Sequence, residues 1–491
     1  MLDQLEEWKR RYGTHDSRDL ERLLGDVARQ SFPDPADLIR LHETLLFLRA
    51  YPQSAGVARR TAAMLRGFAQ RTGGLDPEAF QSPEVSGIAG TTLTAVFTYD
   101  VARHLVARRR DVRIDWEAYE DPSRMGPVLC HILPMISEDW PVEAHTPFED
   151  WVRRSVPRGQ TDLQWLFARI PEPARERYDS MELPLYWRLE GAPHTRSQVY
   201  GEGRVYIHRD RLLRRNDVSL HDAFTAPPLA VVKLPRAEAA RIVDIIVESS
   251  AVRYRELHGF RHPDPAHVYR IDAGRGLEIV WLGVLPEWRL PLRAYHSAMF
   301  FKNGVPAGYF EVLSLFDRVE AGFNLYYTFR EGETAWIYAR LIQAAHQMLG
   351  VNTIVVDPYQ IGLDNEEAID SGAFWFYRKL GFVPVDAAVA RVLAREEGRI
   401  AKSPDHRSSR ATLRKLAAGY LRFDGPAAQP GMWDRFHIRN FAMAGGWDAA
   451  GAAASAVRKA RSSADETRYL KAMQRDPRLR DTVLKLGSTS S

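Results

Sequence analysis

Apolar residues recur at helical spacing through the first part of this chain. Leu38, Leu41, Leu45 and Leu48 are one such run, with apolar residues three or four positions apart. This spacing puts them on one face of a helix that repeats about every 3.6 residues. The pattern predicts helices over most of residues 1–110, including one over 93–108.

The amino-acid composition changes between residues 111 and 224, where prolines and tryptophans are frequent. Apolar pairs on both sides of Gly201 and Gly203 predict a short hairpin over 199–208. We therefore expect a mainly α-helical N-terminal region over residues 1–225, whose role the sequence does not indicate.

Beyond residue 225 strand and helix patterns alternate, which is typical of an α/β domain. Asn303-Gly304 predicts a tight hairpin turn, because both residue types accept positive φ. We expect an α/β mixed-sheet domain over 226–395 and a helical C-terminal extension over 396–491. The predicted strands are 229–234, 277–282, 294–301, 307–316, 322–329 and 353–357, and the predicted helices are 237–257, 335–350, 387–400 and 409–421.

Composition narrows the class of protein. A length of 491 residues predicts two or three domains, and the single cysteine excludes an internal disulfide or a thiolate metal cluster. No basic-then-apolar leader and no apolar run of ~18 residues is visible, so we expect a cytoplasmic protein without a membrane span. A net charge of +4 permits an anionic ligand without calling for nucleic acid. Nothing here indicates an oligomeric state.

The most specific pattern lies between residues 330 and 382. Arg330 and Ala335 enclose a short loop before a helix, and Asp370, Ala373 and Tyr377 precede Gly381-Phe382 at fixed spacing. Over residues 229–385 the chain resembles the GNAT superfamily of N-acetyltransferases. Two positions depart from that pattern. Glu333 stands where the family has its central loop glycine, with Gly332 one residue earlier, and Asp370 stands in place of an asparagine.

The resemblance implies a site for acetyl-CoA or another acyl-CoA. Backbone N–H groups at a helix start carry partial positive charge, so the loop before residue 335 could hold a diphosphate. The resemblance also implies that strand 324–328 separates from strand 353–357 to admit the pantetheine arm. The residues implied in cofactor binding are Asn324, Tyr326, Thr328, Arg330, Gly332, Glu333, Thr334, Ala335, Asp370 and Ala373.

Two glutamates oppose this interpretation. Glu331 and Glu333 place negative charge beside the expected diphosphate, and two unit charges ~4 Å apart repel by ~1 kcal/mol in water or ~4 kcal/mol at an effective dielectric of 20. The same carboxylates could instead cap the helix start themselves. The sequence leaves open whether acyl-CoA binds.

Two residues are candidates for proton transfer. In the family the tyrosine matching Tyr377 protonates the departing thiolate, although Tyr377 also lies on an apolar helical stripe and could be a packing residue. An acceptor amine must lose a proton, at a cost of ~4.6 kcal/mol for a lysine-like amine at pH 7. Glu311 is the candidate base, and His296 is the alternative.

The leading hypothesis is therefore a CoA-dependent N-acyltransferase that acts on a small-molecule or peptide amine by direct attack, without a metal. Two alternatives stand beside it. The fold could serve as a non-catalytic binding or scaffold module, which Glu331, Glu333 and Asp370 favour. The acyl donor could instead be an aminoacyl-tRNA held by the basic C-terminal tail.

Overall fold

The computed structural model describes residues 1–142, 146–189, 193–201, 205–290 and 293–428, together with 481 and 485. The chain divides into two compact units. Unit 1 comprises Met1–Glu202 and Ala240–His262, and unit 2 comprises Gly203–Ala239 and Pro263–Ser491. The boundary therefore passes through helix α12 (Arg236–Ala251), which begins in unit 2 and ends in unit 1.

Unit 1 joins helices to a small antiparallel sheet of order β1-β3-β2. A buried core of aliphatic and aromatic side chains is formed by this sheet and the helices that lie between β1 and β3 in the sequence, with Trp165 and Trp187 fully buried. The elements are α1 (Leu2–Trp8), α2 (Thr14–Ala28), α3 (Pro35–Ala50), α4 (Ala55–Arg66), β1 (Thr92–Val96), α5 (Tyr99–Arg108), β2 (Val112–Ile114), α6 (Gly126–Leu129), α7 (Pro134–Val142), α8 (Phe148–Ser155), α9 (Asp162–Phe167), α10 (Arg175–Ser180), β3 (Pro184–Arg188) and α13 (His258–Arg261), with short 3₁₀ turns at Phe68–Arg71, Pro77–Phe80, Pro122–Met125 and Glu172–Ala174.

Two predictions for this unit are wrong. The helix expected over 93–108 begins only at Tyr99, because 92–96 form strand β1, in which Leu93 and Ala95 are buried and their neighbours are not. That alternation has the period of a strand and not of a helix. The hairpin expected over 199–208 has no strand in its described residues, 199–201 and 205–208.

Unit 2 is built on a nine-stranded sheet of order β11-β12-β10-β9-β8-β7-β6-β5-β4. Only β9 and β10 run parallel in this described sheet, and the other neighbours are antiparallel. The expected mixed α/β class is thereby confirmed. The elements are α11 (Asp222–Thr225), β4 (Ala230–Lys233), β5 (Pro263–Gly274), β6 (Leu277–Val284), β7 (Ala294–Lys302), β8 (Val305–Leu315), β9 (Arg318–Leu325), α14 (Thr334–Leu349), β10 (Thr353–Val356), α15 (Pro358–Ile361), α16 (Glu366–Ser371), α17 (Ala373–Lys379), β11 (Val383–Pro384), α18 (Ala387–Lys402), α19 (Arg410–Leu416) and β12 (Leu421–Asp424), with short 3₁₀ turns at Arg215–Asp217, Pro286–Trp288 and Tyr327–Phe329.

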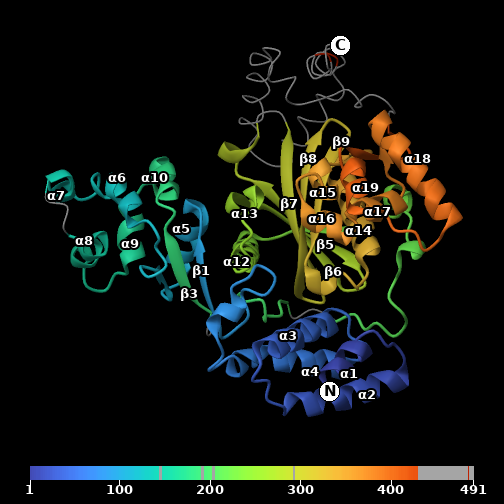
Figure 1. The fold of residues 1–491 in the computed structure, drawn as a ribbon, viewed down its shortest axis with the longest axis horizontal. Helices are drawn as coiled ribbons and strands as arrows, with labels where there is room; N and C mark the ends of the chain where they lie inside the picture. Colours follow the sequence, from blue (N-terminus) through green and yellow to red (C-terminus); the bar gives the residue numbers. More distant parts are fainter. Residues whose placement is uncertain are drawn as a thin grey trace. The chain divides into compact units, whose positions relative to one another are not determined.

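Helices α14 and α17 cover the same face of the sheet (Figure 1). Phe323 of β9 contacts Tyr338 of α14 and Phe376 of α17, with ring centroids 5.2 Å and 6.2 Å apart. Aromatic pairs at such separations stabilise beyond their burial. The aromatic cluster therefore fixes both helices against the strand that borders β10.

A bulge interrupts the hairpin of β7 and β8. Lys302 pairs with Val305 across the Asn303-Gly304 turn, but Phe300 pairs with Gly308, so one residue of β8 is left over. Pro306 has no N–H to give to the ladder, which is typical of a bulge or a strand edge. Beyond the bulge every residue of β8 is displaced by one position relative to β7.

Several predicted bounds in unit 2 change. The strand expected over 322–329 ends at Leu325, and the chain turns through a short 3₁₀ segment at Tyr327–Phe329. The helix expected over 409–421 ends at Leu416, and strands β5 and β12 were not predicted. Most of the predicted C-terminal extension, from residue 429 onward, lies outside the described residues. Within the described part, no helix has the length and apolar character needed to cross a bilayer.

Candidate functional site

β9 extends beyond β10 at the carboxyl end of this parallel pair. They pair in parallel only at Arg318, Val319 and Glu320, opposite Thr353, Ile354 and Val355. β9 then continues to Leu325, still paired with β8 but no longer with β10. Unpaired backbone at the edge of a strand can bind an extended ligand chain. β9 therefore has an edge without a ladder partner beyond Glu320, where the sequence resemblance implied a cleft.

Helix α14 begins directly after the loop that follows β9. Glu333 is its N-cap residue, and the side chain of Glu333 makes no capping hydrogen bond there. The carboxylate of Glu333 points elsewhere: it accepts hydrogen bonds from Lys302 Nζ at 2.9 Å, Arg275 Nε at 3.0 Å and the backbone N–H of Leu213 at 3.1 Å. The Glu333 carboxylate therefore does not occupy the position at the helix start where a phosphate was expected to bind.

Glu333 is the centre of a buried charge cluster that also contains Lys302, Arg275 and His208. Lys302 and Glu333 have fully buried side chains. Burial raises the pKa of Glu333, but Lys302 and Arg275 outweigh it and lower that pKa to about 2. Burial lowers the pKa of Lys302 to about 8 against the opposing effect of Glu333, and lowers that of His208 to about 3. At neutral pH two cations face one carboxylate, so positive charge lies close to the start of α14.

The exposed residues implied in cofactor binding are held by ion pairs. Arg330 pairs with Glu367 of α16, and Asp370 pairs with Arg410 of α19. Surface ion pairs of this kind contribute little to stability and exchange readily. Arg330 can therefore turn toward a phosphate at small cost.

The remaining implied residues lie on β9, in the loop that follows it and at the starts of α14 and α17. Asn324 is on β9 opposite Tyr309, whereas Tyr326 and Thr328 belong to the turn and not to a strand. The N–H of Gly332 is used within the turn, because it donates to Phe329 O at 2.9 Å. Thr334 and Ala335 form the first turn of α14, with the Thr334 hydroxyl bonded to Arg330 O at 3.1 Å, and Ala373 begins α17.

Tyr377 lies in the aromatic cluster between α14 and α17. It is only 3% exposed, and its ring contacts Tyr338 at 5.6 Å and Phe382 at 5.5 Å. Burial raises the pKa of its phenol above the usual range. The hydroxyl therefore stays protonated at any physiological pH, and the ring serves as core packing whatever else it does.

Glu311 lies on the opposite face of the sheet from the aromatic cluster. It pairs with Ser297 of β7 on one side and Gly322 of β9 on the other. Burial raises the pKa of Glu311, while a hydrogen bond from the Tyr295 hydroxyl opposes that rise. A carboxylate with a raised pKa accepts a proton more readily than an exposed one. Glu311 is thus suited to accept a proton at this face of the sheet.

His296, the alternative base, is placed differently. It packs against Trp281 with ring centroids 5.7 Å apart, and its pKa is lowered by burial to about 4. It pairs with Val312, so it points to the other face from Glu311.

Sequence reasoning missed the partners that define these groups: Lys302 and Arg275 for Glu333, and Tyr295, Ser297, Gly322 and Gln360 around Glu311. Alternation along strand 294–301 could have put Tyr295 and Ser297 on one face. No local signal links Glu333 to a lysine 31 residues away or an arginine 58 residues away.

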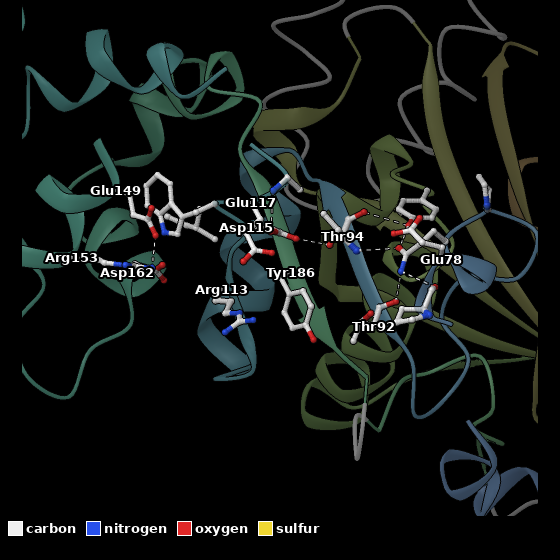
Figure 2. Close-up of a pocket in the computed structure, with 17 residues that line it drawn as sticks. Glu78, Thr92, Thr94, Arg113, Asp115, Glu117, Glu149, Arg153, Asp162 and Tyr186 are labelled. Atoms are coloured by element: carbon white, nitrogen blue, oxygen red, sulfur yellow. Dashed lines mark hydrogen bonds and ion pairs between the residues drawn. The ribbon is translucent and has the colours of Figure 1, made fainter. Parts of the chain in front are cut away.

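Unit 1 has a separate open pocket of about 1280 Å³ beside the β1-β3-β2 sheet (Figure 2). Acidic side chains outnumber basic ones on its walls, and Tyr186 and Trp116 add aromatic surface. Arg113 is held over the Tyr186 ring at 4.5 Å, and Thr94 Oγ1 donates to Asp115 at 2.8 Å. Such walls favour a cationic group over an anionic one. The sequence had not indicated this pocket.

Comparison with protein-family models, with curated proteins and with solved structures finds no match for the chain.

Proposed function

We propose that unit 2 is a CoA-dependent N-acyltransferase of the GNAT type, which transfers an acyl group from acyl-CoA to an amine. The observation that carries the proposal is the parallel pair β9 and β10, which is joined at three register positions before β10 ends and β9 runs on alone to Leu325. The last residues of β9 have no ladder partner on that side in the described sheet, and the pantetheine arm of CoA is a chain of amides that could pair with them.

The electrostatics of the helix start support a diphosphate at this position. The side chain of the N-cap residue Glu333 does not cap the first turn of α14, and a helix start carries partial positive charge. Near the helix start, the two cations Lys302 and Arg275 outnumber the single carboxylate of Glu333. Arg330 lies in the loop that precedes the helix. Ala335 is small enough to let a phosphate approach the backbone. Arg330 would add a charge-assisted hydrogen bond.

The proton transfers are assigned to two side chains on opposite faces of the sheet. Glu311 takes one proton from the ammonium form of the acceptor, which leaves a neutral amine. The nitrogen then attacks the thioester carbonyl, the C–N bond forms and the C–S bond breaks. Tyr377 gives its proton to the leaving thiolate, and the second amine proton returns to solvent as Tyr377 is protonated again. The chain needs no covalent intermediate of its own.

Titration of the whole chain with CoA tests the proposal. We expect heat of binding by calorimetry and a rise in melting temperature, because a ligand that binds only the folded state stabilises it. Acetyl-CoA with an amine should then release free thiol. The absence of both binding signals would favour the non-catalytic binding module. RNA binding with steep salt dependence, in the absence of CoA binding, would favour the aminoacyl-tRNA donor.

Replacing Tyr377 with phenylalanine should slow turnover at least about tenfold, which is below the usual contribution of a general acid. CoA affinity should not change, because the ring contacts with Tyr338 and Phe382 remain. Tyr338→Phe is the matched control. The Tyr338 hydroxyl is buried in the same cluster without a hydrogen-bond partner in the described chain, so its removal should leave turnover unchanged. Equal rates for Tyr377→Phe and the wild type would assign Tyr377 to packing alone.

A further inference from the structure

The pocket of unit 1 lies on the face of the β1-β3-β2 sheet that is turned away from the core. Leu93 and Ala95 of β1 belong to the buried core, and Thr94 alternates with them. Tyr186 of β3 pairs with Thr94 on one side and with Arg113 of β2 on the other. Register partners share a face, so these three side chains form a row across the sheet opposite the core. All three line the cavity of about 1280 Å³ (Figure 2).

The outer edge of β1 is closed by side chains in place of a further strand. β1 is the first strand in the described sheet and pairs there only with β3. Gln81 Nε2 donates to Thr92 O at 3.1 Å, Thr94 N–H donates to Gln81 Oε1 at 3.4 Å, and the Tyr254 hydroxyl donates to Thr94 O at 3.4 Å. A carboxamide has the same donor and acceptor as a peptide group.

These hydrogen bonds are weak enough to be replaced. The two at 3.4 Å are longer than the usual N–H···O or O–H···O limit of about 3.2 Å. Gln81 is only half-buried, and it lines the pocket together with Thr92 and Thr94. An extended peptide backbone that adds to an exposed strand edge forms regular ladder hydrogen bonds. The edge of β1 therefore offers a place for one extended segment, open to the cavity.

The charges on the walls select the occupant. Arg153 is paired with Glu149, and Arg113 lies over the Tyr186 ring, so neither guanidinium neutralises the remaining carboxylates. The rings of Tyr186 and Trp116 also attract cations to their faces. The five carboxylates and two guanidinium groups that line the pocket are Glu78, Asp115, Glu117, Glu149, Asp162, Arg113 and Arg153. An occupant with positive side chains complements this surface, and one with negative side chains is repelled.

We propose that this pocket binds an extended peptide segment that carries lysine or arginine side chains. The backbone of the segment pairs with the edge of β1 and takes the place of the Gln81 carboxamide. Alternate side chains of a strand point to one face, so every second side chain enters the cavity over Tyr186 and among the carboxylates. Backbone pairing supplies the affinity, and the charges supply the preference for basic side chains. The inference is independent of the proposed acyltransferase function, because it uses residues of unit 1 alone.

Three fluorescein-labelled peptides test the proposal with the whole chain. The first is a hexapeptide in which lysine alternates with valine, and the second has glutamate in place of lysine. The third is the lysine peptide with a methyl group on every backbone nitrogen, which removes the backbone donors and keeps the charge. Fluorescence anisotropy gives the three Kd values, and we expect the first peptide to bind at least about tenfold more tightly than the others. No binding of the lysine peptide, or equal binding of either other peptide, would overturn the proposal.

A charge reversal on the wall tests the location. Glu117→Lys changes an exposed residue that lines the pocket and should weaken binding of the lysine peptide at least about fivefold, because one attraction becomes a repulsion. Glu120→Lys is the control: it makes the same change of charge at an exposed position three residues further along, which does not line the pocket. Salt at about 0.15 M screens its effect, so we expect a change below about twofold. Equal weakening by both variants would place the peptide elsewhere.

Gln81→Ala tests the strand edge. The variant loses only long hydrogen bonds from a half-buried side chain, so it should fold, which its melting temperature checks. The edge of β1 is then open, and the lysine peptide should bind at least about threefold more tightly because it no longer displaces the carboxamide. Unchanged or weaker binding in a folded variant would show that the peptide does not pair with this edge.

Discussion

Replacing Glu333 with glutamine will lower the free energy of unfolding of unit 2 by about 3–5 kcal/mol, because Lys302 is left buried without its carboxylate. Lys302 is fully buried and bonds Glu333 at 2.9 Å, and Arg275 remains as a second cation. The measurement is denaturant unfolding followed by tryptophan fluorescence, with unit 1 as an internal reference if the two units unfold separately.

Two further variants test whether the loss of stability in Glu333→Gln arises in the buried charge cluster. Glu331→Gln changes an exposed carboxylate in the same loop and should alter stability by no more than about 0.5 kcal/mol. Adding Lys302→Met to Glu333→Gln removes the unpaired ammonium and should recover much of the loss, since a buried pair can be replaced by apolar side chains at little cost. A loss as large in Glu331→Gln, or no recovery in the double variant, would contradict the buried cluster as the cause.

The pH dependence follows from the same residue. The pKa of Glu333 falls from an ordinary value of 4.5 to about 2 on folding. As pH falls, Glu333 is protonated in the unfolded chain before it is protonated in the folded chain. The contribution of Glu333 to the free energy of unfolding is therefore complete above pH 4.5 and is lost as pH falls toward 2. Glu333→Gln lacks that dependence, so the stability difference between the wild type and Glu333→Gln should shrink across this window.

Replacing Glu311 with glutamine will reduce acyl transfer about 100-fold or more, the range for loss of a general base. Glutamine keeps the volume but cannot accept the proton of the acceptor ammonium. Because burial raises the pKa of Glu311, the wild-type rate should fall on the acid side as that carboxyl becomes protonated. The variant should lack this acid limb while its CoA affinity stays the same.

The variant Tyr295→Phe distinguishes a role of Glu311 as a base from a role in packing. The Tyr295 hydroxyl donates to Glu311 and so restrains the rise in the carboxyl pKa. Without that hydrogen bond the pKa of Glu311 should rise further. The acid limb of the pH–rate profile should then move to higher pH, while the rate of acyl transfer above that limb stays the same. Loss of rate at every pH, with an unmoved limb, would assign Tyr295 and Glu311 a structural role only.

Local patterns predicted most elements of the sheet domain. The helix expected over 335–350 is α14, Thr334–Leu349, and Gly350 ends it in the left-handed conformation that glycine adopts readily. Strands with continuous apolar runs, such as β6 and β10, were also found. β5 was missed because two prolines and several charged residues interrupt its pattern, and β12 because four residues give too little periodicity.

The site was less predictable because it depends on register and on distant contacts. A two-residue turn at Asn303-Gly304 would place Ser297 opposite Phe310, whereas the bulge places it opposite Glu311. A single extra residue reverses which side chains share a face. The direction of the Glu333 side chain depends on Lys302 at the end of β7 and on Arg275 in the turn between β5 and β6.

The place of β12 has a consequence for synthesis. This segment, Leu421–Asp424, is the last described strand of the chain, yet it inserts between β10 and β11 and pairs with both. The four residues of β10 are fully buried in the finished sheet. Until residue 424 has left the ribosome, β10 has a bare apolar edge, which is the kind of surface that recruits other strands. A nascent chain stalled near residue 400 would therefore be a substrate for chaperones.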